Sequence, residues 1–237
     1  MEACTELVVE RDRSGRSVLA RSSCEVPLLF RVADHDGPAL HLSWVNGAAG
    51  PLGGDRLRLH LRVGAGASVR VRSTGASMVQ PSARGGRSTT EVRIELGEGS
   101  RLDWCPEPTI SVRGSDHRTS TRIVADPSAL ARVVEQVSLG RHDEPGGRLA
   151  LHQRAVVGER AVLDHELVLG DGPLAGPGAH GPGRAVLSAL VLGRAPELRV
   201  EVTPSSAAAV LDLDGGAWLV SATAPDLRVL SAWLPAS

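Results

Sequence analysis

Aromatic and lysine side chains are scarce in this chain of 237 residues. It has four Trp, one Phe and no Tyr, so the aromatic platforms that stack bases or sugars are not expected. All 26 basic residues are arginine, which excludes a lysine Schiff base and a phosphate-loop lysine. The net charge is −1, so no overall positive field favours a polyanion. We therefore expect no nucleic-acid partner.

Cysteines and long apolar runs are also few. The three cysteines are an odd number and include no Cys-x-x-Cys pair, which is typical of a reducing compartment. The first residues are rich in acidic side chains and contain no apolar leader segment, and the apolar stretch 185–192 is too short to span a bilayer. The sequence thus predicts a cytoplasmic protein with no targeting segment and no membrane partner.

Strict alternation of polar and apolar residues is the clearest pattern that is present. It runs from Arg56 to Val63 and returns at 68–72 and 90–96, as expected for half-buried β-strands. Such strands present one side to a core and the other to water. The low aromatic content means that Val, Leu, Ile and Ala must fill that core.

An internal repeat connects these strands. The segments 63–69 and 96–102 match as strand, glycine turn and strand, and a weaker third copy lies at 124–130. Turns that recur roughly every 30 residues are typical of layered repeat folds, in which each unit buries its apolar face on the next. The predicted fold is therefore mainly β, with layered, β-helix-like (solenoid-like) sheets and about two α-helices, in a single domain over 1–237.

Several other segments are assigned from local patterns. Residues 131–139 fit either a strand or a helical stripe, and we interpret them as a strand, whereas 184–202 stays open between helix and strand. The glycine- and proline-rich stretch 170–183 is predicted to be a long loop or linker. Further predictions are a hairpin of 7–9 with 17–20, strands at 27–32, 40–45, 149–157 and 161–169, a hairpin of 207–213 with 217–222, and a helix from Asp226.

Motifs for catalysis are missing. The sequence shows no nucleophile elbow, phosphate loop, zinc motif or dinucleotide fingerprint, and no spacing brings a Ser, a His and an Asp together. The Gly64-Ala65-Gly66 turn is followed by a strand, so it cannot aim a helix N-terminus at phosphate. We predict that the chain is not an enzyme and holds no tightly bound cofactor.

Two acidic residues are candidates for binding a metal cation. Asp55 follows two glycines at the start of a strand, where a carboxylate either caps a turn or lines a polar passage. Glu135 lies within an apolar strand, where an unpaired charge is expensive. Cys105, beside Trp104, fits a small core residue better than a thiolate ligand.

The segment Asp164-His165-Glu166 is the third candidate. Alternation places Asp164 and Glu166 on the face opposite Leu163 and Leu167, so that His165 points inward with the two leucines. A hydrogen-bonded core histidine is the simpler interpretation, and a metal ligand is the alternative. Carboxylate and imidazole groups suit divalent nickel, and separated ligands would bind it weakly and transiently.

Four short motifs, in this order and spacing, resemble the urease accessory protein D family, which is called H in some bacteria. They are Gly53-Gly54-Asp55, Thr74-Gly75-Ala76-Ser77, the run from Leu102 to Ile110, and Leu139-Gly140-Arg141. The resemblance is continuous from about Gly50 to Arg141 and weaker toward the C-terminus. It implies the same layered β fold that the repeats predict.

The resemblance also implies a function. Members of that family are cytoplasmic chaperones that bind a helical accessory protein, F, which recruits a GTPase, G. The assembly docks on the urease apoprotein and helps insert nickel. A dimer of the D protein within this assembly is one option. Nickel is thought to pass through a tunnel in the D protein. On this basis Asp55, Glu135, Asp164, His165 and Glu166 become candidates for transient nickel passage, with His165 standing where relatives have Glu.

The sequence leaves two alternative functions open. A cytosolic β-solenoid that serves as a structural or protein-interaction module would need no metal. A carbohydrate-active β-helix enzyme would need convergent carboxylates and aromatic sugar platforms, for which the aromatic content is a poor fit.

Overall fold

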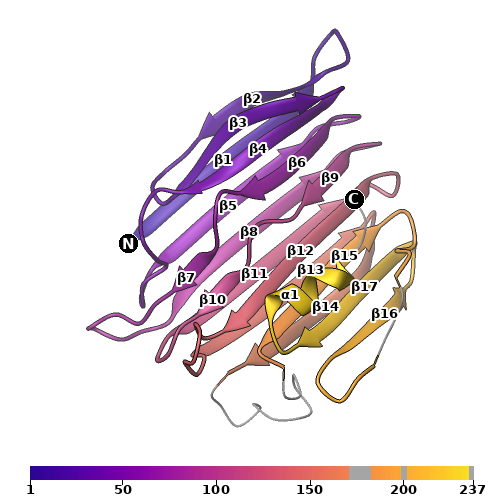
Figure 1. Cartoon of the computed structure of the whole chain (residues 1–237). Coiled ribbons are helices and arrows are strands. Elements are labelled where there is room, and N and C mark those ends of the chain that lie inside the picture. The colour runs from indigo at the N-terminus through magenta and orange to yellow at the C-terminus, as the bar shows by residue number, and fades with distance from the viewer. Residues whose placement is uncertain (171–182, 199–201, 235–237) are drawn as a thin grey trace.

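Two β-sheets stacked face to face form the body of the computed structural model, which describes residues 1–170, 183–198 and 202–234 (Figure 1). The seven-stranded sheet has the order β14-β13-β11-β8-β5-β1-β2. Its strands are β1 (Glu2–Arg11), β2 (Ser17–Ser23), β5 (Arg56–Val63), β8 (Ser88–Leu96), β11 (Asp116–Ala125), β13 (Arg148–Val157) and β14 (Arg160–Leu169).

The ten-stranded sheet has the order β16-β17-β15-β12-β9-β6-β4-β3, with β10 paired to β12 and β7 paired to β10. Its strands are β3 (Leu28–Asp36), β4 (Ala39–Asn46), β6 (Ser68–Ser73), β7 (Ser77–Val79), β9 (Arg101–Trp104), β10 (Thr109–Ser111), β12 (Leu130–Leu139), β15 (Ala185–Leu192), β16 (Ala207–Leu213) and β17 (Ala217–Ala224). The prediction of a mainly β, layered fold is confirmed.

The predicted repeat corresponds to three stacked coils. In each coil a strand of the seven-stranded sheet passes through a tight turn into a strand of the other sheet: β5 to β6, β8 to β9 and β11 to β12. Equivalent strands are parallel and in register, with Val63 beside Leu96 and Leu96 beside Ala125. Gly66 and Gly99 turn with positive φ, a conformation that glycine adopts without steric cost.

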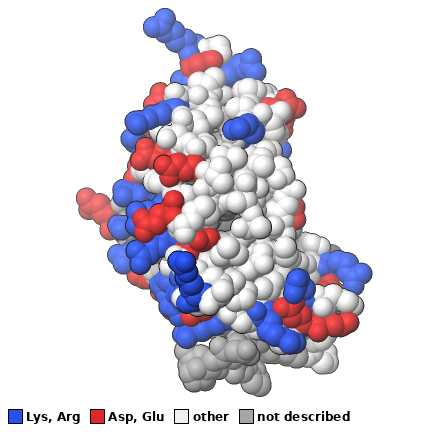
Figure 2. Space-filling model, turned by 90° about the vertical axis from the view of Figure 1, so that its left-hand side faces the viewer, with Lys and Arg blue, Asp and Glu red and all other residues white. Residues whose placement is uncertain are grey.

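The core lies between the sheets and is aliphatic, as the composition predicts. Alternate residues of the strands, such as Leu57, Leu59, Leu61 and Val63 on β5, are almost fully buried. The intervening residues are exposed and mostly charged. Figure 2 shows charged side chains gathered along its left margin, over the outer face of the seven-stranded sheet, beside a largely uncharged end of the molecule.

The C-terminal segment covers the outer face of the other sheet. The α-helix α1 (Leu227–Leu230) begins at its N-cap Asp226 and continues as a 3-10 turn, Ser231–Trp233. Leu230 and Trp233 pack on β15 and β17, and the predicted helix from Asp226 is confirmed. It is the one α-helix within the described ranges, so the helical content is smaller than the sequence suggested.

The structure assigns the two segments that the sequence left between helix and strand. Residues 131–139 lie within strand β12, and part of 184–202 forms strand β15, in which every residue is buried because both of its faces are covered. Most of the predicted loop, residues 171–182, lies outside the described residues. No helix among the described residues is long and apolar enough to cross a membrane.

Candidate functional site

Polar residues occupy the core at one end of the seven-stranded sheet. On β8 and β11 the inward-facing residues begin polar and become apolar along the strand, as in His117, Thr119 and Thr121 followed by Ile123 and Ala125, while on β13 the buried Gln153 lies among apolar residues. Buried polar groups need hydrogen-bond partners or water, so these side chains predict a hydrated space between the sheets. The inward polar residues on the three strands are Ser88, Thr90, His117, Thr119, Thr121 and Gln153.

The opposite sheet is interrupted at the same level. Strand β12 pairs with β9 through residues 130–133 and with β10 through 137–139, so residues 134–136 have no ladder partner on that side. The segment 105–108 between β9 and β10 contains Pro106 and Pro108, which have no N–H to donate to a ladder. Glu135 stands at the centre of this gap.

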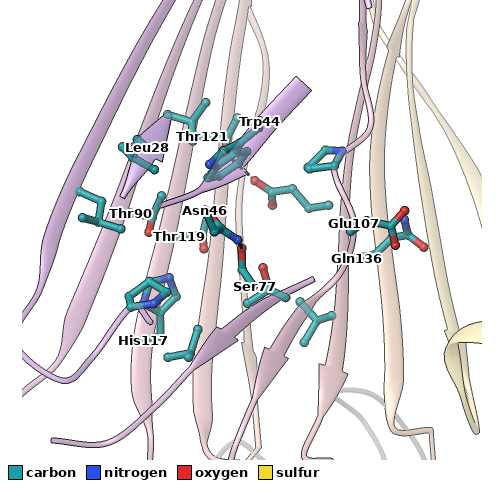
Figure 3. Close-up of a pocket in the computed structure, with 18 of the residues that line it drawn as sticks. Leu28, Trp44, Asn46, Ser77, Thr90, Glu107, His117, Thr119, Thr121 and Gln136 are labelled. Atoms are coloured by element: carbon teal, nitrogen blue, oxygen red, sulfur yellow. Dashed lines mark hydrogen bonds between the residues drawn. The ribbon is translucent and has the colours of Figure 1, made fainter. Parts of the chain in front are cut away.

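A cavity of about 70 Å³ lies between the polar strand ends and the gap. A water molecule needs about 10–15 Å³ of such space, so several waters fit. Polar side chains from both sheets point into the space, as Figure 3 shows for Asn46, Ser77, Thr119 and Thr121. The lining also includes Trp44, Pro51, Thr90, Glu107, His117, Glu135 and Gln136.

Glu135 is the one acidic side chain in the wall that is buried. Thr121 donates a short hydrogen bond to Oε1, while Oε2 is buried without a protein partner. Burial disfavours the charged form and raises the pKa of Glu135 from 4.5 to about 7, and the Thr121 hydrogen bond opposes this rise. Near neutral pH this carboxyl is therefore present in both its protonated and its ionised form, and its Oε2 has no protein partner.

His117 lines the same cavity and was not among the residues that the sequence singled out. Its Nδ1 lies 2.8 Å from Ser88 Oγ, and burial lowers its pKa from 6.5 to about 4. The imidazole is therefore neutral at physiological pH, which is the form that coordinates metals. The cavity thus combines one carboxyl and one neutral imidazole from opposite sheets.

A second polar bridge between the sheets adjoins Glu135. Ser188, which pairs with Glu135 across β12 and β15, donates to Gln153 Oε1 at 2.6 Å. Gln153 in turn pairs with His165 across β13 and β14. Gln153 Nε2 and His165 Nε2 are both buried without a protein partner.

His165 is half-buried and faces the core, as predicted, and burial lowers its pKa. It shares this side of β14 with Leu163 and Leu167. The polar groups that begin at Glu135 thus continue through the interior toward β14, although His165 itself is not part of the cavity wall.

Asp55 is buried beside the cavity, and both of its carboxylate oxygens accept hydrogen bonds. Its Oδ2 accepts from the backbone N–H of Leu52 at 2.9 Å, and its Oδ1 lies 2.7 Å from the amino group of Met1. These contacts hold the loop whose Gly50 and Pro51 form part of the wall. Of the two roles left open by the sequence, the geometry fits the turn cap, and it places that turn at the edge of the cavity.

Asp164 and Glu166 lie outside the core, on the outer face of the seven-stranded sheet. Asp164 accepts from His152 Nε2 at 2.9 Å and from Arg154 Nη1 at 3.0 Å, and these contacts lower its pKa. Glu166 forms an ion pair with Arg118. Asp164 and Glu166 therefore lie close to neither Glu135 nor Asp55.

The remaining metal-binding side chains do not gather. Among the described residues no three His, Cys, Asp or Glu side chains come close enough to hold a metal ion as a cluster. The three cysteines are free, and burial raises the pKa of Cys105, so that its thiol stays protonated. A cation in this interior would meet one or two protein ligands and complete its shell with water.

These features define a class of protein: a two-sheet β-solenoid with a small polar cavity between its sheets. The model of the UreD urease accessory protein family matches residues 1–236. The chain belongs to this family.

Curated relatives support the assignment over most of the chain. The urease accessory protein UreD of Parafrankia sp. (strain EAN1pec) is 35% identical over 253 residues, covering 97% of this chain and 85% of the relative. UreD of Streptomyces avermitilis is 35% identical over 238 residues, with 97% and 93% covered. UreD 3 of Streptomyces griseus is 33% identical over 244 residues, with 99% and 94% covered.

Proposed function

We propose that this chain is a cytoplasmic, non-enzymatic chaperone of urease maturation and that nickel passes through its interior cavity. Its family membership supports the first part. The observation that carries the second part is Glu135, a buried carboxyl with one unpartnered oxygen in a hydrated space between the sheets.

The chemistry of the cavity suits a cation that is handled and released. The proton on Glu135 is held weakly enough to be displaced by a divalent cation near neutral pH. His117 supplies a neutral imidazole, and carboxylate and imidazole are ligands that nickel accepts. Because few protein ligands converge, binding is expected to be weak, as release to an acceptor protein requires.

The other candidates have different roles in this proposal. Asp55 fixes the loop at the edge of the cavity, and His165 extends the polar interior toward β14. Asp164 and Glu166 lie on the outer face, where they would meet nickel only before or after its passage.

The proposed partners are those that the family resemblance implies. They are the helical accessory protein F, the GTPase accessory protein G and the urease apoprotein, with a dimer of this chain in the complex as one option. In this view nickel is a cargo rather than a resident cofactor.

The direct test is to express urease and the other accessory genes with and without this chain, and to measure nickel content and urease activity. Both are expected to collapse without the chain. Equal nickel content in the two preparations would overturn the proposal.

A further inference from the structure

The outer face of the seven-stranded sheet carries a row of positive charge that the proposed nickel passage does not use. Register places Arg93 on β8, Arg122 on β11 and Arg154 on β13 side by side, with His60 next to Arg93 on β5. We call these three arginines the arginine row. They lie on the outer face over which charged side chains gather in Figure 2.

The arginine row is not explained by the stability of the sheet. Neighbouring strands are about 4.8 Å apart, so three guanidinium groups start from adjacent backbones and repel one another. Arg93 lies 2.5 Å from Glu95, and Arg154 lies 3.0 Å from Asp164. Arg122, the central member, is exposed and has no ion pair with any described residue.

The charges beside the row restrict what could bind there. In the rows on either side, Arg58 lies beside Glu91 and Arg62 lies beside Glu95, and Glu166 ends the first of these rows. A wide, uniformly negative partner such as a nucleic acid would also meet Glu91 and Glu95, whereas the arginine row itself presents three adjacent guanidinium groups. A narrow acidic surface that follows the arginine row would avoid these carboxylates.

An α-helix has the dimensions for this pattern. Its pitch of about 5.4 Å is close to the strand spacing of about 4.8 Å, so a helix lying across the strands can place one carboxylate per turn over each arginine. The mismatch over the row is about 1 Å, which flexible arginine side chains absorb. Basic residues on the flanks of that helix would face Glu91 and Glu95.

We propose that the arginine row is a docking site for an acidic α-helix of a partner protein, which lies across β8, β11 and β13 with its carboxylates on Arg93, Arg122 and Arg154. The site is separate from the cavity, so it does not depend on the nickel proposal. Its contribution is electrostatic, and it should weaken as salt increases.

The test uses the full chain and a fluorescent, alanine-based helical peptide with one glutamate per turn along a single face. A second peptide has the same composition with its glutamates distributed around the helix. Anisotropy at low salt should show at least tenfold tighter binding of the one-faced peptide. Arg122→Glu should weaken that binding at least tenfold, while the control Arg13→Glu, in an exposed turn, should change it less than twofold.

A second readout separates docking from a structural role. Arg122→Gln should weaken peptide binding and leave the urea midpoint of the chain unchanged or higher, because it removes a repelled charge. The proposal is overturned if the two peptides bind equally, if Arg13→Glu is as harmful as Arg122→Glu, or if an oligonucleotide binds more tightly than the one-faced peptide.

Discussion

Two buried groups of the cavity should give the stability of the metal-free chain opposite dependences on pH. Glu135 has its pKa raised to about 7, and His117 has its pKa lowered to about 4. Both shifts arise from burial of the charged form. Each group therefore stays neutral in the folded chain over a range in which the unfolded chain is charged.

The sign differs for the two groups. Between pH 4.5 and 7 the folded state keeps the Glu135 proton that the unfolded chain has released, so stability falls as pH rises. Between pH 6.5 and 4 the histidine becomes protonated in the unfolded chain, whereas the buried His117 of the folded chain stays neutral, so stability falls as pH decreases. At about 1.4 kcal/mol per pH unit, each group accounts for about 3 kcal/mol, and the two effects largely cancel.

Single substitutions should reveal how each of the two groups changes the free energy of unfolding with pH. Urea unfolding at pH 4.5 and pH 7.5 is expected to show that Glu135→Gln gains about 3 kcal/mol relative to the original chain on going to the higher pH. His117→Asn should instead lose a similar amount over the same interval. Comparing each variant with the original chain removes the contribution of all other titrating groups.

The exposed carboxylate Glu91 supplies the control. Glu91→Gln removes one carboxyl from the surface of β8 and should follow the original chain at both pH values. If the stability of Glu135→Gln also changes with pH as that of the original chain does, burial does not hold Glu135 neutral. The proposal that the cavity binds a cation through this carboxyl is then refuted.

Three further predictions concern the fold and the edge of the cavity. Leu61→Ala, at a fully buried position, should lower the free energy of unfolding by about 2–5 kcal/mol, and a loss below 1 kcal/mol in urea unfolding would contradict the packing described. Gly140→Ala should abolish soluble expression, because its Cβ would lie 2.1 Å from the carbonyl oxygen of Glu144 at a φ of +79°. Asp55→Ala should leave the chain folded by circular dichroism and lower the nickel content of urease matured with it; unchanged nickel would remove Asp55 from the passage.

Much of the fold follows from sequence because strands with one buried side alternate strictly. Residues 56–63 are an example, and the glycine turns at 64–66 and 97–99 fix the length of each coil. The position of Glu135 inside an apolar strand likewise indicated a buried acid, which the structure places between the sheets.

The rest of the site was hidden for a physical reason. Strand β11 has His117, Thr119 and Thr121 on its inner side, so it lacks the apolar alternation that identifies a strand. The same residues that make the cavity polar therefore make the strand hard to recognise. The gap in the ten-stranded sheet at residues 105–108 depends on how distant segments pair with strand β12. The two prolines of this segment were the one local indication in the sequence that the ladder is interrupted there.

In the proposed function, nickel reaches urease by way of Glu135. The most direct measurement is the nickel content per active site of urease matured in cells with the original chain, with Glu135→Gln or with Glu91→Gln at equal expression. Glu135→Gln, although folded and more stable at neutral pH, should deliver several-fold less nickel, while Glu91→Gln should deliver the normal amount. Normal nickel content with Glu135→Gln would contradict this proposal.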